Sequence, residues 1–105
     1  MKKTFLVVYA KCIGSNFAGQ APDVPGCVSA GDTLDEMRSM MKEALEGHFQ
    51  VLADYGDPLP EPSSKMIDIK EEDFEGVEYF VVEHLSIELP QKPAIHRTRE
   101  AILAA

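Results

Sequence analysis

The pattern of apolar and polar positions begins with two short strands. Residues 4–10 (TFLVVYA) are apolar, β-branched or aromatic almost without interruption. Such a run is typical of a strand that is covered on both faces or lies centrally in a sheet. Residues 13–16 (IGSN) carry a turn signal, and residues 17–21 (FAGQA) then alternate in character. We therefore expect a hairpin at the start of the chain.

A proline-containing turn separates this hairpin from a third strand. Pro22 and Pro25 lack a backbone donor, and Gly26 permits a positive φ, so the chain must leave the sheet here. Residues 27–30 (CVSA) then resume as a strand. The three strands are predicted to form an antiparallel meander.

A long amphipathic helix follows. Thr33 and Glu36 form a capping box, in which the hydroxyl accepts from the Glu36 N–H and the carboxylate reaches back. Gly56 can adopt a left-handed cap, and the prolines after it forbid continuation, so the helix spans about residues 34–55. Its apolar stripe steps by three or four residues and is expected to face the sheet. The stripe consists of Leu34, Met37, Met41, Leu45, His48, Leu52 and Tyr55.

The second half of the chain predicts an acidic connection and one more strand. Residues 63–78 crowd negative charge, which opposes a buried element, and Ile67, Ile69 and Phe74 could anchor either a short helix or an irregular crossing. Residues 78–89 form a long strand rich in Val, Leu and Ile. The order of elements predicts an α+β fold, β-β-β-α-β, with one long helix packed on the sheet.

Length and charge limit the class of protein. A chain of 105 residues with 45% hydrophobic residues holds one core, so we expect one domain over residues 1–90 and a short basic tail over residues 91–105. The formal net charge of -8 argues against general nucleic-acid binding, because phosphate contacts depend on Lys and Arg. An acidic surface suits a basic protein partner, and it equally suits a protein that is merely soluble.

The sequence predicts a cytoplasmic protein. The apolar run after Lys2 and Lys3 is too short for a signal peptide and is interrupted by Lys11, and no stretch approaches the roughly 20 apolar residues of a membrane span. Cys12 and Cys27 lack the close spacing of a zinc knuckle or a redox pair. Both are expected to be reduced thiols in or beside strands.

Three segments carry a recognisable family pattern: APDVPGCVSAGDTLDE at residues 21–36, ALEGH at 44–48 and DYGDPLPEPS at 54–63. In these segments the first two thirds of the chain resemble the HicB antitoxin family. The resemblance implies a truncated RNase H-like fold. It also implies a partner, HicA, which is a small toxin related to double-stranded-RNA-binding domains that cleaves messenger RNA and whose active site the antitoxin covers.

The C-terminal part departs from the family pattern. Antitoxins of this family usually continue into a ribbon-helix-helix or helix-turn-helix segment that binds DNA, and such a unit needs roughly 40 residues. Only KPAIHRTREAILAA, residues 92–105, remains here. We therefore expect no DNA-binding segment and no direct nucleic-acid binding.

Catalysis is not expected, although the RNase H resemblance invites the hypothesis of a metal-dependent nuclease. Such a nuclease needs an acid in the middle of the first strand, and residues 4–10 contain none. His48, His84 and His96 share no chelating spacing, so no metal and no cofactor are predicted.

A binding role remains. The residues expected to contact a basic partner are Asp68, Glu71, Glu72, Asp73 and Glu75. The same residues could equally form a solvated loop. A homo-oligomer, most simply a dimer, is expected because a small sheet leaves a hydrophobic strand edge. The alternative to an antitoxin is a solitary HicB-like scaffold or regulator without a toxin.

Overall fold

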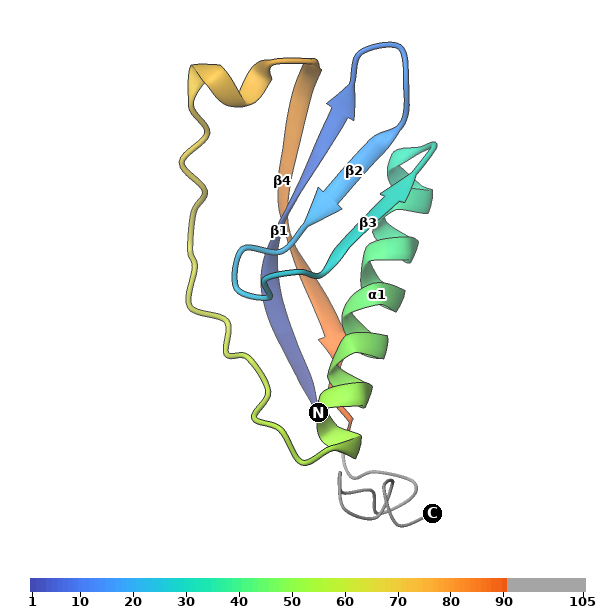
Figure 1. Cartoon of the computed structure of the whole chain (residues 1–105), viewed down its shortest axis with the longest axis vertical. Helices are drawn as coiled ribbons and strands as arrows, with labels where there is room; N and C mark the ends of the chain where they lie inside the picture. The colour runs from blue at the N-terminus through green and yellow to red at the C-terminus, as the bar shows by residue number, and fades with distance from the viewer. Residues whose placement is uncertain (91–105) are drawn as a thin grey trace.

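The structure, a computed structural model, describes residues 1–90 and contains one four-stranded sheet with a long helix on one side (Figure 1). The elements are β1 (Lys2–Cys12), β2 (Phe17–Gln20), β3 (Val28–Gly31), α1 (Leu34–Asp54), the 3-10 helix η1 (Glu71–Phe74) and β4 (Val77–Glu88). The predicted α+β class and order of elements are confirmed. The predicted basic tail at residues 91–105 lies outside the described residues.

β1 is a central strand of the sheet, whose order is β3-β2-β1-β4 with all neighbours antiparallel. It pairs with β4 along its whole length, from Lys2 opposite Glu88 to Cys12 opposite Val77. Its C-terminal half also pairs with β2. Residues 5–9 are all buried, so both faces of β1 are covered, as the continuous apolar pattern predicted. The meander of the first three strands is confirmed, and β4 extends the sheet on the other side of β1.

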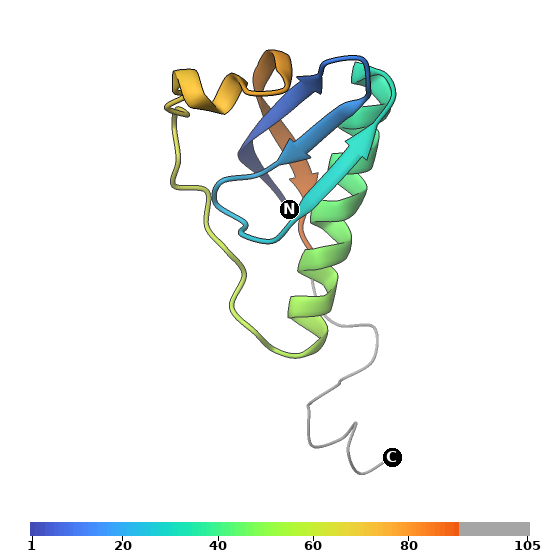
Figure 2. The ribbon, with the colours of Figure 1, turned by 45° about the horizontal axis from the view of Figure 1, so that its top comes forward.

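α1 covers one face of the sheet, and a connection without regular structure runs on the other side from the end of α1 to η1 (Figures 1 and 2). We call this connection, residues 57–70, the crossing segment. The face under α1 is the inner face, and the opposite face is the outer face. The inner face is therefore covered by a regular helix, and the outer face by a segment without regular structure.

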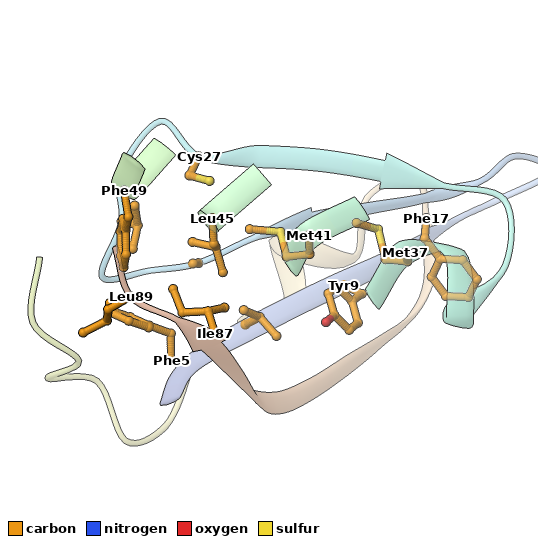
Figure 3. Close-up of a cluster of buried hydrophobic side chains, with 13 residues drawn as sticks. Phe5, Tyr9, Phe17, Cys27, Met37, Met41, Leu45, Phe49, Ile87 and Leu89 are labelled. Atoms are coloured by element: carbon orange, nitrogen blue, oxygen red, sulfur yellow. The ribbon is translucent and has the colours of Figure 1, made fainter. Parts of the chain in front are cut away.

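The core lies between α1 and the inner face (Figure 3). The helix contributes Met37, Met41, Leu45 and Phe49, each fully buried. Phe49 packs edge-on against Phe5 of β1 with ring centroids 5.3 Å apart. This aromatic pair closes the end of the core near the end of α1.

One part of the predicted helical stripe was wrong. Phe49 is buried where His48 was expected, and His48 is only half-buried. Tyr55 lies just beyond the helix and is 37% exposed. The buried positions are spaced by four residues, so their row winds around the helix axis and follows the twist of the sheet beneath it. The predicted stripe used steps of both three and four residues, which keeps it straight along the helix, so it did not follow this winding row.

The helix termini form largely as predicted. The Glu36 N–H donates to Thr33 Oγ1 at 3.1 Å, while the Glu36 carboxylate accepts from the Asp32 N–H at 3.4 Å and not from Thr33. At the other end Gly56 has φ +73°, and the Asp57 N–H donates to the Leu52 carbonyl at 2.9 Å. The left-handed turn ends the helix and directs the chain into the crossing segment.

Two glycines allow α1 to approach the sheet closely. A Cβ atom on Gly31 would lie 2.6 Å from the backbone N of Met37 and 2.8 Å from its Cα. A Cβ atom on Gly19 would lie 2.7 Å from Met37 Cε. The obstacle at Gly31 is helix backbone, which cannot turn aside as a methionine side chain can. The contact between β3 and the start of α1 therefore depends on the absence of a side chain at Gly31.

We predict that Gly31→Ala lowers the free energy of unfolding by about 1–3 kcal/mol, because the added methyl forces β3 and α1 apart. The matched control is Gly47→Ala. A Cβ at Gly47 meets nothing within 4 Å, and alanine favours a helix, so stability should rise by about 0.5–1 kcal/mol. Denaturant titration measures both changes. A neutral Gly31→Ala would contradict the close approach.

Candidate partner-binding site

The five acids predicted to bind a partner lie together at the end of the crossing segment. Glu71, Glu72 and Asp73 are on η1, Asp68 precedes it, and Glu75 follows it. All five are exposed, and η1 has no buried residue. We call these residues the acidic run. The sequence left open a short helix or an irregular crossing for this region, and both occur, one after the other.

Most of the acidic run is not neutralised within residues 1–90. The Asp73 carboxylate accepts from the Lys70 backbone N–H at 2.9 Å. The carboxylates of Asp68, Glu71, Glu72 and Glu75 make no hydrogen bond or ion pair in this part of the chain. Their charges are therefore available to a molecule that approaches this end of the sheet.

The crossing segment is tied to the turn before β3 through Asp23. The Asp23 carboxylate accepts from the backbone N–H groups of Ser63 at 2.9 Å and Ser64 at 2.8 Å. It also accepts from their hydroxyl groups, at 3.0 and 2.7 Å. These hydrogen bonds, led by those from Ser64, hold the pKa of Asp23 below its usual value. One side chain thus fixes the middle of a segment that has no regular structure.

Two neighbouring cross-strand rows on the outer face of the sheet run across all four strands. The register aligns Val28, Gln20, Val8 and Val82 in one row. It aligns Ala30, Ala18, Ala10 and Phe80 in the next. Three alanines side by side leave the surface low, and the large Phe80 ring forms a wall at the β4 end of the second row. Val28 stands on this face with 67% of its surface exposed.

A groove with a volume of about 540 Å³ lies between this face and the crossing segment. Ala10, Ala18 and Val28 belong to its floor, while Ile67 and Ile69 face them from the crossing segment. Asp68 and Asp73 of the acidic run also line it. We call this space the outer groove. Its lining combines apolar residues with two acidic residues, and it lies on the side of the sheet away from α1.

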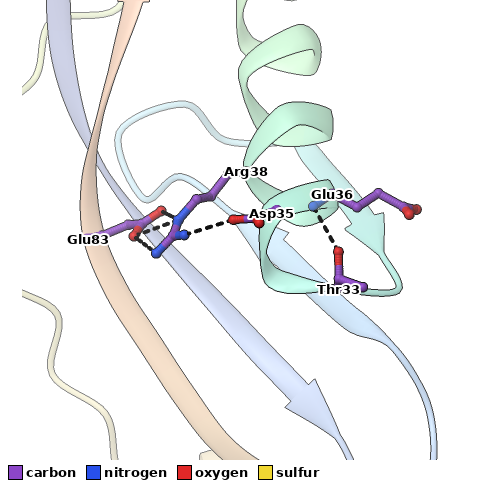
Figure 4. A network of polar contacts seen from close by, with 5 residues as sticks. All are labelled: Thr33, Asp35, Glu36, Arg38 and Glu83. Atoms are coloured by element: carbon purple, nitrogen blue, oxygen red, sulfur yellow. Dashed lines mark hydrogen bonds and ion pairs between the residues drawn. The ribbon is translucent and has the colours of Figure 1, made fainter.

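A second polar cluster joins the first turns of α1 to β4 on the inner side (Figure 4). Arg38 Nε donates to both Glu83 oxygens, at 2.9 and 3.1 Å, and Nη2 donates to Oε2 at 3.0 Å. Arg38 Nη1 donates to Asp35 at 3.3 Å. The Arg38 hydrogen bonds lower the pKa of Glu83. The Tyr9 hydroxyl is buried beside this pair, and burial followed by the Glu83 carboxylate raises the pKa of Tyr9 well above its usual value.

Two acids outside the acidic run, Asp23 and Glu83, are therefore engaged by other parts of the fold. The Glu83 carboxylate forms an ion pair with Arg38, and the Asp23 carboxylate accepts hydrogen bonds from the serines of the crossing segment. Residues 1–90 contain no group of three His, Cys, Asp or Glu side chains that could hold a metal ion. The same part of the chain has no helix that is both long and apolar enough to cross a bilayer.

The outer groove was not predicted from the sequence. Ile67 and Ile69 indicated a crossing, but nothing local shows which face of which strands they cover. The feature of the sequence that could have indicated it is one small side chain on each of two neighbouring strands, Ala10 on β1 and Ala18 on β2. These positions align only once the strand register is known.

Comparison with protein families gives a match over nearly the whole chain. The model of a family described as HicB-like antitoxin of bacterial toxin-antitoxin system matches residues 5–103. A curated relative, an uncharacterized 14.9 kDa protein in the rep-hol intergenic region of Haemophilus phage HP1, is 39% identical over 57 residues. That match covers 51% of this chain and 43% of the phage protein, so it spans less than half of the relative's length.

Solved structures share the fold. A chain of a toxin-antitoxin complex from Streptococcus pneumoniae has a TM-score of 0.71 at 17% identity, with 93% of this chain and 80% of that chain covered. The antitoxin HicB of Burkholderia pseudomallei has a TM-score of 0.65 at 25% identity, with 97% and 93% covered. A chain of the HicA3 and HicB3 toxin-antitoxin complex has a TM-score of 0.58 at 24% identity, with 84% and 99% covered.

Proposed function

This chain belongs to the HicB-like antitoxin family, and from that premise we propose that it binds and neutralises a small basic toxin of the HicA type. The match of the family model over residues 5–103 carries the proposal. Its setting would be the cytoplasm, where messenger RNA is cleaved by such a toxin. The role is binding, and the protein itself would leave RNA uncut.

The charge of the described surface supports a basic partner. The whole chain has a formal net charge of -8, and four carboxylates of the acidic run have no partner within residues 1–90. Opposite charges on two surfaces accelerate their encounter and penalise the wrong partners. A toxin that binds RNA needs Lys or Arg side chains on its RNA-binding surface. The acidic run is therefore our choice for the charged contact.

A small basic reading frame beside this gene would encode the toxin for the test, and the absence of such a frame would favour the solitary regulator. Co-expression of the wild-type chain should relieve the growth arrest caused by that toxin. Replacement of Asp68, Glu71, Glu72, Asp73 and Glu75 by Ser should slow association by about tenfold at low salt and flatten its dependence on ionic strength.

The matched single substitutions are Glu72→Ser in the acidic run and Glu43→Ser on the exposed side of α1. Each removes one charge, and only the first should slow association. Equal effects of the two would remove the acidic run from the interface. A wild-type chain that neither binds the toxin nor relieves the arrest would contradict the antitoxin role and favour a solitary regulator.

We further propose that two copies associate through β4. This edge strand has 12 residues, and within residues 1–90 it pairs only with β1. Tyr79 and Val82 on it are 46% and 43% exposed. A long edge strand with unpaired backbone groups and exposed apolar side chains favours pairing with another strand. An antiparallel β4 pair would join two sheets into one.

Light scattering at micromolar concentration should give the mass of a dimer. Substitution of Val82 by Lys should shift that mass toward the monomer, because it places a charge on each side of the pairing edge. A monomer mass for the wild-type chain would overturn the dimer while leaving the antitoxin role untouched.

A further inference from the structure

We infer that the outer groove is the docking site for an extended basic segment of the toxin. The segment would place an apolar side chain on the alanine floor and a Lys or Arg side chain against Asp68 and Asp73. This inference rests on the proposed antitoxin function and names the surface and the partner chemistry through which it acts.

The shape of the groove sets the size of its occupant. The alanine row lowers the floor, and Phe80 and the crossing segment form its sides. A volume of about 540 Å³ is within the range of sites that hold a small ligand or a few side chains, and it is too small for a folded element. A short extended stretch of chain fits these dimensions.

The lining of the groove sets the chemistry. Val28, Ala10 and Ala18 offer an apolar surface, while Asp68 and Asp73 belong to the lining of the same groove. Across residues 65–78 six acids stand against two lysines. Lys and Arg carry an apolar stem with a charged end, so either side chain can lie along the floor and reach a carboxylate. An acidic or purely apolar segment would leave these charges without a counterpart.

Charge also argues against a second copy of this chain as the occupant. The chain has a formal net charge of -8, so a second copy would bring more negative charge to a groove that already carries two carboxylates. The β4 edge proposed for dimerisation lies at the far side of the sheet from Val28. Phe80 of β4 borders the groove, but dimerisation would use the backbone edge of β4, whereas docking would use the floor formed by Ala10, Ala18 and Val28.

The crossing segment can adjust to an occupant because side chains hold it. Within residues 1–90, no backbone hydrogen bond joins residues 58–70 to a strand. Its tethers are the ion pair of Glu61 with Lys3 of β1, and Asp23, which holds Ser63 and Ser64. Beyond its end, Phe74 of η1 packs edge-on against Phe80 with ring centroids 4.9 Å apart. The groove therefore has a rigid floor and a side that can shift between two fixed points.

The test compares two valines with similar exposure. Val28 in the groove is 67% exposed, and Val51 on α1 is 55% exposed. In the full chain, Val28→Lys should weaken binding of the purified toxin from the adjacent gene by about tenfold or more, because its ammonium group fills the groove and neutralises the acids. Val51→Lys should change the affinity by less than about twofold. Both variants should keep the wild-type melting temperature, since neither valine is buried.

A second variant separates charge from shape. Asp68→Asn removes one groove carboxylate and should weaken binding, whereas Glu43→Gln on α1 should not. If the wild-type chain neutralises the toxin and Val28→Lys binds it as tightly, the groove inference is wrong while the antitoxin function stands. If Val28→Lys changes the oligomeric mass of the free protein, a second copy occupies the groove and the inference is again wrong. If the wild-type chain does not bind the toxin, both proposals fail.

Discussion

The rest of the structure depends on the close packing of α1 against a single face of the sheet. Four strands and one helix form two layers, and the core between them contains nearly all the fully buried side chains. Gly31 allows the helix backbone to approach β3, and Arg38 holds the start of the helix to Glu83 of β4. One helix can cover only one face, so the other must be covered by something else.

Because the two faces are covered so differently, we assign partner binding to the outer face. On the outer face β1 is still buried at Leu6 and Val8, yet within residues 1–90 that side is covered by the crossing segment and η1. Asp23, the Lys3–Glu61 ion pair and the Phe74 ring hold this covering in place. Surfaces positioned by side chains and bordered by unpaired charge suit recognition, since they can adjust without disturbing the core. The inner layer provides stability, and the outer layer presents the acidic run and the groove.

The sequence predicted the elements whose signals are local. The N-cap at Thr33, the stop at Gly56 and the continuous apolar run of β1 each act within a few residues, and each was confirmed. The return hydrogen bond of the predicted capping box was not, since the Glu36 carboxylate accepts from Asp32. Features that depend on alignment between distant segments were not predicted. The burial of Phe49 in place of His48 reflects the twist of the sheet, which no helical pattern contains.

The candidate site divides in the same way. The clustering and exposure of the acidic run follow from the sequence, because burying so many carboxylates within a few residues would cost too much free energy. The outer groove requires the register that aligns Ala10 with Ala18 and Phe80, and it requires the path of the crossing segment. The role of Asp23 as a tether depends on a contact 40 residues away in the chain. Such long-range contacts are set by the fold as a whole.

Hydrogen exchange on the protein with and without its toxin tests the central claim most directly, namely that the outer face is the face that binds. The amides of the crossing segment, η1 and β3 should exchange more slowly in the complex, while those of α1 keep their rates. Slower exchange along α1, with no change in the crossing segment, would contradict the account and place the partner on the helical side.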